Sequence, residues 1–545
     1  MELKVDIAIL GFGFAGSLAG TIARRLGRRV VIVDRDSHPR FAIGESSTPA
    51  ADMILRSLCD RYDVPRLRPL ATWGTWQRSC PHVRGGIKRG FSYFMHEPGV
   101  PFAPNARHSS ELLAAASPDN EHSDTQWYRA DVDAFFAEEA ARAGAVILEN
   151  TVVDHVERTD GWHLQGVRGG EERVSIRADF VIDATGAAGV LSRYLNIPTR
   201  DMRTRSRAVF GHFTGVPRWT DLAAARGART TDYPFDPDFS ALHHVLDGAW
   251  MWMLRFKDET LSAGFAIDEA RHPVDVSVSP EAEFFERLET YPSLREVFAG
   301  ATVADPPGKI IRTGRLQRWT VQAAGPDWAL LPHAAGFVDP LHSTGIAHTL
   351  CGIERLMDVL SRHWMRPELT PALESYSRGV VREFAFIDLL VACCYRSMSS
   401  FRLWTASTML YFAAATSYER VRAMDGEAAR DRLFLLADEP SLFGAAAEAL
   451  DLLEGGRAGR WGGDGGDASG GGQGRGGRNS GRDRDGDSGC DGDPGRDGDQ
   501  SRDQDRARNE GDYERLVEEA IRPFNHVGLF RPAVQNMYRH TAAPK

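Results

Sequence analysis

Residues 1–34 read MELKVDIAILGFGFAGSLAGTIARRLGRRVVIVD, and this stretch decides the fold class. Residues 3–10 form a short apolar run, which is typical of a buried parallel strand. A Gly-x-Gly-x-x-Gly turn follows at residues 11–16, and a helix of small residues is expected at 17–26. A second apolar strand then ends at Asp34. This order of strand, turn, helix, strand and acid predicts a βαβ unit that binds a dinucleotide.

Each glycine of the turn has a mechanical reason. Gly11 permits the tight bend, Gly13 lets the backbone approach a pyrophosphate, and Gly16 lets the helix pack closely on the strand. The N–H groups and the dipole at the start of the helix favour phosphate, and Asp34 is placed to accept the hydroxyls of a ribose. We also expect cofactor contacts from the adjacent residues Ala15 and Arg35. A βαβ unit without a bound phosphate is the alternative.

The composition is that of an ordinary globular protein. Of 545 residues, 42% are hydrophobic and 26% are charged, and a chain of this length forms two or three regions with sizeable cores. The net charge of −10 argues against a general nucleic-acid-binding protein. The six cysteines have no C-x-x-C spacing, so we expect reduced thiols and no metal site. No signal peptide or membrane-spanning apolar run is visible, which predicts a cytoplasmic protein without a membrane partner.

A second strand-to-glycine turn lies further along the chain. Residues 172–182 predict a strand, and it runs into Asp183-Ala184-Thr185-Gly186. Two such turns are typical of a flavin-type nucleotide domain, in which distant segments return to one cofactor. We therefore divide the chain into FAD-binding segments at 1–205 and 305–362, an antiparallel substrate sheet at 206–304, a helical region at 363–454, an insertion at 455–512, and a C-terminal helix and tail at 513–545. The insertion consists of Gly, Asp and Arg with almost no apolar residue, so we expect it to be disordered.

Lys88 lies in the glycine-flanked segment GGIKRG, residues 85–90, between clusters of aromatic residues. Partial burial beside so much aromatic surface would make its ammonium group more reactive than that of a surface lysine. A solvated lysine on a strand is the plain alternative. Trp250 and Trp252 lie on one face of a predicted strand by period-two alternation. For this pair, core packing is the alternative to a role in a site.

Residues 332–345 read PHAAGFVDPLHSTG and precede a long predicted helix. Small residues before a helix N-terminus form a pocket of backbone N–H groups, which could stabilise a reduced flavin or hold a halide. A plain helix cap by Ser343 or Thr344 is the alternative. Arg129, at the start of another predicted helix, could contact a cofactor phosphate or pair with an acid.

Several dispersed motifs together resemble those of the flavin-dependent halogenases. The motifs are GFGFAG at 11–16, GESSTP at 44–49, GIK at 86–88, WMW at 250–252 and GFVDPLHSTG at 336–345. The resemblance covers about residues 1–400 and is strongest to the branch that acts on pyrrole or phenol groups, some of them attached to carrier proteins. It implies an α/β fold, in which an FAD-binding Rossmann-like domain of the para-hydroxybenzoate hydroxylase type is joined to an antiparallel substrate sheet and a helical C-terminal region.

The resemblance also implies a reaction. A separate flavin reductase supplies FADH2, and O2 together with chloride or bromide yields hypohalous acid, which passes through a tunnel to Lys88. The lysine either donates a hydrogen bond to this acid or carries the halogen as a chloramine, and arginine could not serve equivalently. The implied substrate is a small electron-rich aromatic ring, a phenol or a pyrrole, either free or attached to an acyl or peptidyl carrier protein.

The resemblance assigns further site residues. Thr344 and Gly345 match the halide-binding turn, and Trp250 and Trp252 match two tryptophans that keep the substrate away from the flavin. His342 stands where tryptophan halogenases have a glutamate, and it is a candidate acid or base. Beyond the first turn, Asp34 and Arg35, the expected cofactor-binding residues are Glu45, Ser46, Arg129, Val153, Asp183, Gly186, His333, Gly336, Asp339, Gly345 and Ile346.

The sequence departs from the family's pattern in three motifs. Leu254 and Arg255 follow the tryptophans in place of an Ile-Pro pair. Pro332-His333 stands in place of a Gly-Asp pair, and His342 stands in place of the glutamate. These changes leave two other functions open. One is a flavin monooxygenase or alkene reductase on the same scaffold, and the other is a flavoprotein without turnover that docks a carrier protein or a redox partner.

Overall fold

The structure, a computed structural model, describes residues 1–425, 428–455 and 495–541. Its first sheet has the order β18-β19-β10-β1-β2-β7, with β8 and β9 attached to β10. The strands are β1 (Glu2–Leu10), β2 (Val30–Val33), β7 (Val146–Leu148), β8 (Thr151–Arg158), β9 (Trp162–Arg168), β10 (Glu172–Asp183), β18 (Ala324–Gly325) and β19 (Trp328–Leu330). The predicted βαβ unit is confirmed, because β1 and β2 are parallel neighbours on either side of α1 (Phe14–Arg25).

The two glycine turns meet at one edge of this sheet. Leu10 is paired with Asp183 across parallel strands β1 and β10, so both strands end at the same level. A Cβ atom placed on Gly11 would lie 2.5 Å from the carbonyl oxygen of Ala184. The predicted return of the second turn to the first is therefore present, and only glycine permits this approach.

The second sheet has nine strands in the order β15-β11-β14-β13-β12-β4-β5-β21, with β16 beside β11. The strands are β4 (Gly90–Met95), β5 (Glu111–Ala115), β11 (Ser206–Thr214), β12 (Ala241–Leu246), β13 (Ala249–Arg255), β14 (Leu261–Asp268), β15 (Thr302–Val303), β16 (Ile311–Arg312) and β21 (Met537–Tyr538). Most neighbours are antiparallel, as predicted, but β12 pairs with β4 in parallel. The sheet also takes β4, β5, β16 and β21 from outside residues 206–304, because the edges of β12 and β11 pair with strands from distant parts of the chain, β4 and β16.

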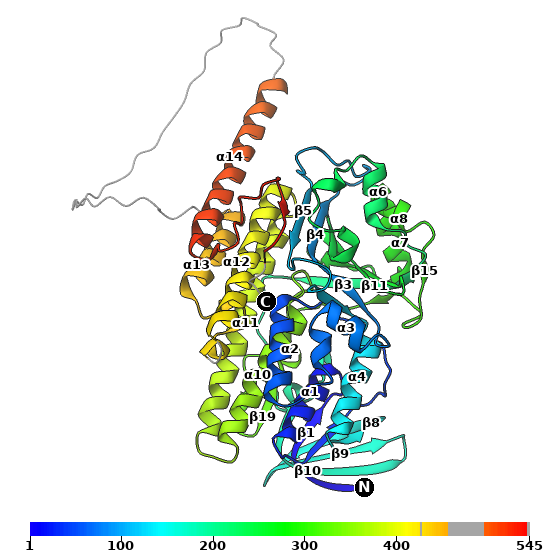
Figure 1. Cartoon of the computed structure of the whole chain (residues 1–545), viewed down its shortest axis with the longest axis vertical. Coiled ribbons are helices and arrows are strands. Elements are labelled where there is room, and N and C mark those ends of the chain that lie inside the picture. Colours follow the sequence, from blue (N-terminus) through cyan, green and yellow to red (C-terminus); the bar gives the residue numbers. More distant parts are fainter. Residues whose placement is uncertain (426–427, 456–494, 542–545) are drawn as a thin grey trace, which may run out of the picture.

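Helices cover both sheets (Figure 1). The shorter ones are α2 (Pro49–Arg61), α3 (Trp73–Ser79), α4 (Arg129–Arg142), α5 (Val190–Tyr194), α6 (Trp219–Ala225), α7 (Pro280–Thr290), α8 (Pro292–Val297) and α9 (Pro332–Ala335). The helices from residue 344 onward are α10 (Thr344–His363), α11 (Leu369–Ser397), α12 (Phe401–Asp425), α13 (Pro440–Leu453) and α14 (Gly495–Ile521). They form a column along one side of the molecule, next to both sheets (Figure 1). Two short pairs, β3 (Gly85–Lys88) with β6 (Asp124–Trp127) and β17 (Arg318–Trp319) with β20 (Gly336–Phe337), complete the fold.

The predicted disorder of residues 455–512 is wrong for its last part. Residues 456–494 lie outside the described residues, but residues 495–512 form the first turns of α14. Tyr513, Val517 and Ile521, spaced by four, are buried at the other end of this helix. Burial of that apolar stripe anchors the helix, and residues 495–512 continue it although eight of them are Gly or Asp, which are poor helix formers.

Three expected absences concern the described part of the chain. Within it, no helix is long and apolar enough to cross a membrane. Among the same residues, no group of three or more His, Cys, Asp and Glu side chains is placed to hold a metal ion. Five of the six cysteines are buried free thiols, while Cys490 lies outside the described residues.

Candidate active site

The first glycine turn lies beside two arginine–aspartate pairs. Gly16 packs as predicted, because a Cβ atom there would lie 2.0 Å from the carbonyl oxygen of Gly11. A Cβ atom on Gly13 would lie 3.3 Å from a carboxylate oxygen of Asp133, 3.8 Å from a guanidinium nitrogen of Arg129 and 3.9 Å from one of Arg40. Both guanidinium groups are paired, Arg129 with Asp133 and Arg40 with Asp34, and they lie beside the start of α1. Sequence analysis missed Arg40, which follows a loop with no recognisable motif.

Asp34 lies at the end of β2, as predicted, and one of its oxygens already has two donors. Its Oδ2 accepts hydrogen bonds from the backbone N–H of Phe12 at 2.7 Å and from Arg40 at 3.1 Å. Arg35 points away from the turn and is paired with Asp36, its side chain being 72% exposed. Asp34 therefore ties the loop after β2 to the turn, whereas Arg35 has no visible link to it.

Arg129 pairs with an acid, which was the alternative to a phosphate contact. Its guanidinium forms two hydrogen bonds with Asp133, at 2.7 and 2.8 Å. It also donates to the carbonyl oxygens of Ile43 and Gly44. These bonds hold the segment before α2 against α4, and they fix the guanidinium beside Gly13.

Lys88 is fully buried at the end of β3, so the alternative of a solvated strand lysine is wrong. Its ammonium donates a hydrogen bond to the carbonyl oxygen of Ser47 and lies 4.1 Å from the centre of the Phe91 ring. Burial lowers the pKa of Lys88 to about 8, against the opposing effects of Asp124, Asp52 and Glu419. An amine with this pKa holds both protonation states in useful amounts near neutral pH.

Two adjacent serines connect Lys88 to the turn before α10. The backbone carbonyl of Ser47 accepts the hydrogen bond from Lys88. The hydroxyl of the preceding residue, Ser46, is 3.0 Å from that of Ser343. Ser343 has a left-handed backbone with φ of 52° and makes no side-chain cap to α10. The plain helix cap by Ser343 is therefore wrong, because its hydroxyl is used across the site. The lysine and the turn at Thr344 are held to one rigid segment.

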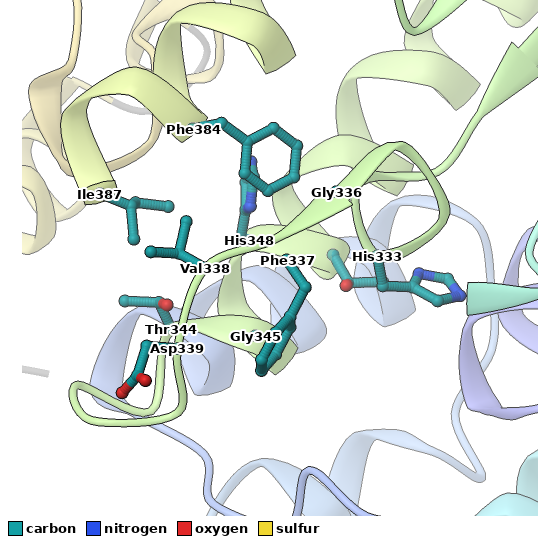
Figure 2. Close-up of a pocket in the computed structure, with 11 residues that line it drawn as sticks. His333, Gly336, Phe337, Val338, Asp339, Thr344, Gly345, His348, Phe384 and Ile387 are labelled. Atoms are coloured by element: carbon teal, nitrogen blue, oxygen red, sulfur yellow. The ribbon is translucent and has the colours of Figure 1, made fainter. Parts of the chain in front are cut away.

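The turn itself lines a small pocket between residues 336–339, the first turn of α10 and helix α11 (Figure 2). Asp339, Thr344 and Gly345 all face this region, and no atom lies within 4 Å of the Cβ position of Gly345. Asp339 accepts hydrogen bonds from Ser206 and Tyr395, both at 2.8 Å. Burial raises the pKa of Asp339 to about 6, although these bonds oppose the shift.

His333 lies beside the second glycine turn, at the start of α9. Its Nε2 is 3.0 Å from the carbonyl oxygen of Ala184, and its buried Nδ1 has no partner. Burial lowers its pKa to about 4, so the ring is neutral at pH 7. Asp183 instead accepts three bonds from its own turn, including those from the backbone N–H groups of Thr185 and Leu191.

The remaining predicted cofactor residues differ in how they are held. Glu45 is buried, and its Oε1 is 2.8 Å from His212, while its Oε2 has no partner. Ile346 is buried in α10, and Val153 is a half-buried apolar residue of β8. Gly186 has φ of 59°, and a Cβ atom there would lie 3.6 Å from His333. Val153 packs against the core, and its contact with the cofactor stays a prediction.

Trp250 and Trp252 are both buried, with ring centres 5.8 Å apart. The indole N–H of Trp250 donates to Tyr395 at 3.2 Å, and that of Trp252 donates to Ser262 at 3.3 Å. Tyr395 in turn donates to Asp339. The two tryptophans thus belong to the core, as the alternative states, and Trp250 is also linked to the turn before α10.

An aromatic wall that sequence analysis missed connects these residues. Phe91, which contacts the Lys88 ammonium, lies 6.1 Å from the ring of His243, and His243 lies 5.2 Å from Trp250. Helix α12 adds Tyr411 and Phe412, at 5.9 and 5.7 Å from Phe91. The aromatic residues of α12 were visible in the sequence, but their contact with β4 depends on tertiary packing between segments about 300 residues apart.

His342 lies against the same wall. Its ring is stacked on Tyr411, with centres 4.2 Å apart and planes at 3°, and its Nε2 is 3.7 Å from the thiol of Cys394. Burial lowers the pKa of His342 to about 3. A ring that is neutral above pH 3 does not supply a proton at pH 7, so the predicted role as an acid does not fit this environment.

Comparison with known proteins agrees with this geometry. Residues 122–408, more than half of the chain, match the family model described as tryptophan halogenase. The monodechloroaminopyrrolnitrin halogenase PrnC of Pseudomonas fluorescens is 29% identical over 483 residues, which cover 84% of this chain and 82% of that protein. The tetracycline 7-halogenase of Kitasatospora aureofaciens is 28% identical over 426 residues, covering 75% and 73%.

The fold is also that of a solved halogenase. The crystal structure of halogenase PltM in complex with phloroglucinol and FAD superposes with a TM-score of 0.78, covering 99% of this chain and 100% of that one at 23% identity. Both PltM and this chain have a mixed α/β fold with a helical C-terminal region. The chain therefore belongs to the tryptophan halogenase family and is a flavin-dependent halogenase.

Proposed function

We propose that this enzyme uses FADH2 from a separate reductase, O2, and chloride or bromide to halogenate a small electron-rich aromatic ring of the phenol or pyrrole type. The observation that carries the proposal is the fully buried amine of Lys88, which is enclosed by aromatic side chains and joined through Ser47, Ser46 and Ser343 to the turn at Thr344. Full burial of a lysine ammonium is costly to the fold, and such groups with a shifted pKa cluster at functional sites.

The described residues fit FAD. Gly13 has no side chain beside the start of α1, and Arg129 and Arg40, each paired with an aspartate, lie within 4 Å of its Cβ position. Asp34 retains acceptor capacity for a ribose, because an ionised carboxylate accepts about four bonds. Two buried polar atoms without protein partners, Nδ1 of His333 and Oε2 of Glu45, suit the polar edges of a cofactor. When bound, FAD supplies the activation of O2 that oxidises the halide.

The protein's own groups then have separate tasks in this proposal. The N–H groups at the start of α10, at Thr344 and Gly345, hold the halide. The aromatic wall of Phe91, Tyr411 and Phe412 excludes water and packs against the substrate ring. Lys88 directs the hypohalous acid to that ring by donating a hydrogen bond, which polarises the oxygen–halogen bond.

The test of this function is a reconstituted assay. Purified protein is incubated with FAD, a flavin reductase, NADH, O2 and either chloride or bromide, together with a panel of free and carrier-bound phenols and pyrroles. We expect a product whose mass rises by the replacement of hydrogen with the added halogen. Halide-independent oxygen insertion, or double-bond reduction without O2, would instead support the monooxygenase or alkene reductase. Stoichiometric binding of a carrier protein without turnover would support the docking scaffold.

The substitution at Arg255 does not favour a monooxygenase or an alkene reductase over a halogenase. Arg255, which replaces the family's proline, is buried and donates to the carbonyl oxygens of Val216 and Pro217. It also lies 3.5 Å from Asp238. The departure therefore provides an ion pair and hydrogen bonds that hold the end of β13, a structural role compatible with halogenation.

The pKa of Lys88 predicts a pH dependence. Because the ammonium is the stronger donor, we expect the rate of halogenation to fall as the pH rises through about 8. Asp124 is paired with Lys88 across β3 and β6, and its charge raises the lysine pKa. In an Asp124→Asn variant, the fall in rate should occur at lower pH. The matched control is Asp160→Asn, on an exposed hairpin, and an unchanged midpoint in Asp124→Asn would contradict the assignment.

A further inference from the structure

An arginine cluster lies on the far face of β11 from the turn at Asp339. Ser206 points to one face of the strand and donates to Asp339, whereas the next residue, Arg207, points to the other face, under α7. Arg207 is 1% exposed. Helix α7 contributes Glu283 and Arg287 one turn apart, and β16 contributes Arg312 beside β11.

A single carboxylate serves all three arginines. Glu283 accepts hydrogen bonds from Arg207 at 2.5 Å and from Arg312 at 2.7 Å. Arg287 lies 3.5 Å from the same carboxylate. Three guanidinium groups around one acid leave two positive charges in excess. Buried charge of one sign is unfavourable unless an opposite charge is close.

The hydrogen bonds of the cluster are also incomplete. Two nitrogens of Arg207, Nε and Nη1, are buried without a partner, and so is Nε of Arg287. Arg312 differs, because it also donates to the backbone carbonyls of Asp275 and Val278. The unused donors therefore belong to Arg207 and Arg287.

From this excess of charge and of buried donors, we infer that Arg207 and Arg287 bind a small inorganic anion in a site separate from the proposed halide turn. Halide ions and oxyanions such as phosphate share the chemistry that the site recognises, since both accept several N–H bonds. The anion would neutralise part of the cluster and fix α7 on the sheet. The inference concerns binding alone and does not rest on the proposed reaction.

The experiment measures the thermal midpoint of the full chain in titrations of sodium chloride, sodium bromide and sodium phosphate. Sodium gluconate keeps the ionic strength constant, so that general screening does not contribute. We expect a saturable rise of the midpoint with at least one of the three anions, since a ligand that binds only the folded state stabilises it. The anion that saturates at the lowest concentration identifies the class.

Three variants make the result specific. Arg287→Met, which keeps the pair between Arg207 and Glu283, should weaken the apparent affinity about tenfold or more, and Arg207→Met should remove the response. The control is Arg205→Met, since Arg205 is 63% exposed and paired with Glu269. A response that is absent in the wild type, or unchanged in Arg287→Met, would overturn the inference.

A crystallographic measurement covers the case in which Arg207→Met does not fold. Crystals of the wild type grown or soaked in bromide should show an anomalous peak within hydrogen-bonding distance of Arg207, and phosphate should show electron density at the same place. Empty density in both cases would overturn the inference. A bromide peak at Thr344 alone would do the same, while leaving the proposed halogenase function intact.

Discussion

Halogenation should fall at least about 100-fold when Lys88 is replaced by methionine, the scale of effect typical for loss of a group that handles a proton or a polar transition state. Methionine keeps an apolar side chain, but it removes the amine, which lies over the Phe91 ring and donates to the carbonyl oxygen of Ser47. Because the substitution also leaves the buried carboxylate of Asp124 with one positive neighbour fewer, some loss of stability is expected beside the loss of activity. The measurement is product formation per enzyme with the reductase in excess, together with a titration of FAD binding.

Lys257→Met is the matched control. Lys257 is exposed, and its backbone N–H bonds to the carbonyl of Gly85 at the start of the strand that carries Lys88. Its loss should leave both halogenation and FAD binding near the wild-type values. Lys88→Met that halogenates at the wild-type rate would remove the lysine from the mechanism. Loss of FAD binding in that variant would show that the residue serves the cofactor instead.

Glu383→Gln should lower the free energy of unfolding by about 3 kcal/mol, the lower end of the range for breaking a buried ion pair. Glu383 is fully buried in α11 and accepts bonds from Arg355 at 2.6 Å, His348 at 2.9 Å and the backbone N–H of Phe434 at 2.7 Å. Glutamine keeps acceptor capacity but leaves the charge of Arg355 buried without a counter-charge. Denaturant titration at pH 7 measures the change, with Glu374→Gln, an exposed pair on the same helix, as control.

The pH dependence of stability provides a second measure of the same group. Burial alone would raise the pKa of Glu383, but Arg355 and the hydrogen bonds hold it at about 2. A carboxylate whose pKa is lower in the folded state stabilises that state at pH values above its pKa in the unfolded chain. This stabilisation is lost as the pH falls toward 2. The wild type should therefore lose more stability than Glu383→Gln between pH 5 and pH 2. Parallel losses in the two proteins would contradict this account of the ion pair.

Sequence reasoning reached those parts of the molecule that depend on local patterns. The turn at Gly11, the strands beside it and the antiparallel pairing around Trp250 follow from periodicity and from glycine geometry. The full burial of Lys88 does not, because Phe91, which lies beside its ammonium, is itself covered by Tyr411 from a segment about 300 residues away. The same holds for the bond between Ser46 and Ser343, and for Arg40, whose approach to Gly13 depends on a loop without periodicity.

The prediction that the whole insertion is disordered was wrong for a similar reason. Composition describes how little apolar surface a segment can bury by itself, and Ala507 is the only apolar side chain in residues 495–512. These residues continue a helix whose far end, at Val517 and Ile521, is packed against the rest of the protein. The residues that anchor the helix follow residue 512, so the composition of residues 495–512 alone could not predict it.

The contact between Phe91 and Tyr411 has a consequence for protein synthesis. A nascent chain that has left the ribosome only as far as residue 363 already contains both glycine turns and the turn at Thr344. The side of Phe91 that packs against Tyr411 and Phe412 would still be open to water, because α12 has not yet been translated. The ring beside the Lys88 ammonium is therefore covered on that side only after synthesis has passed α12.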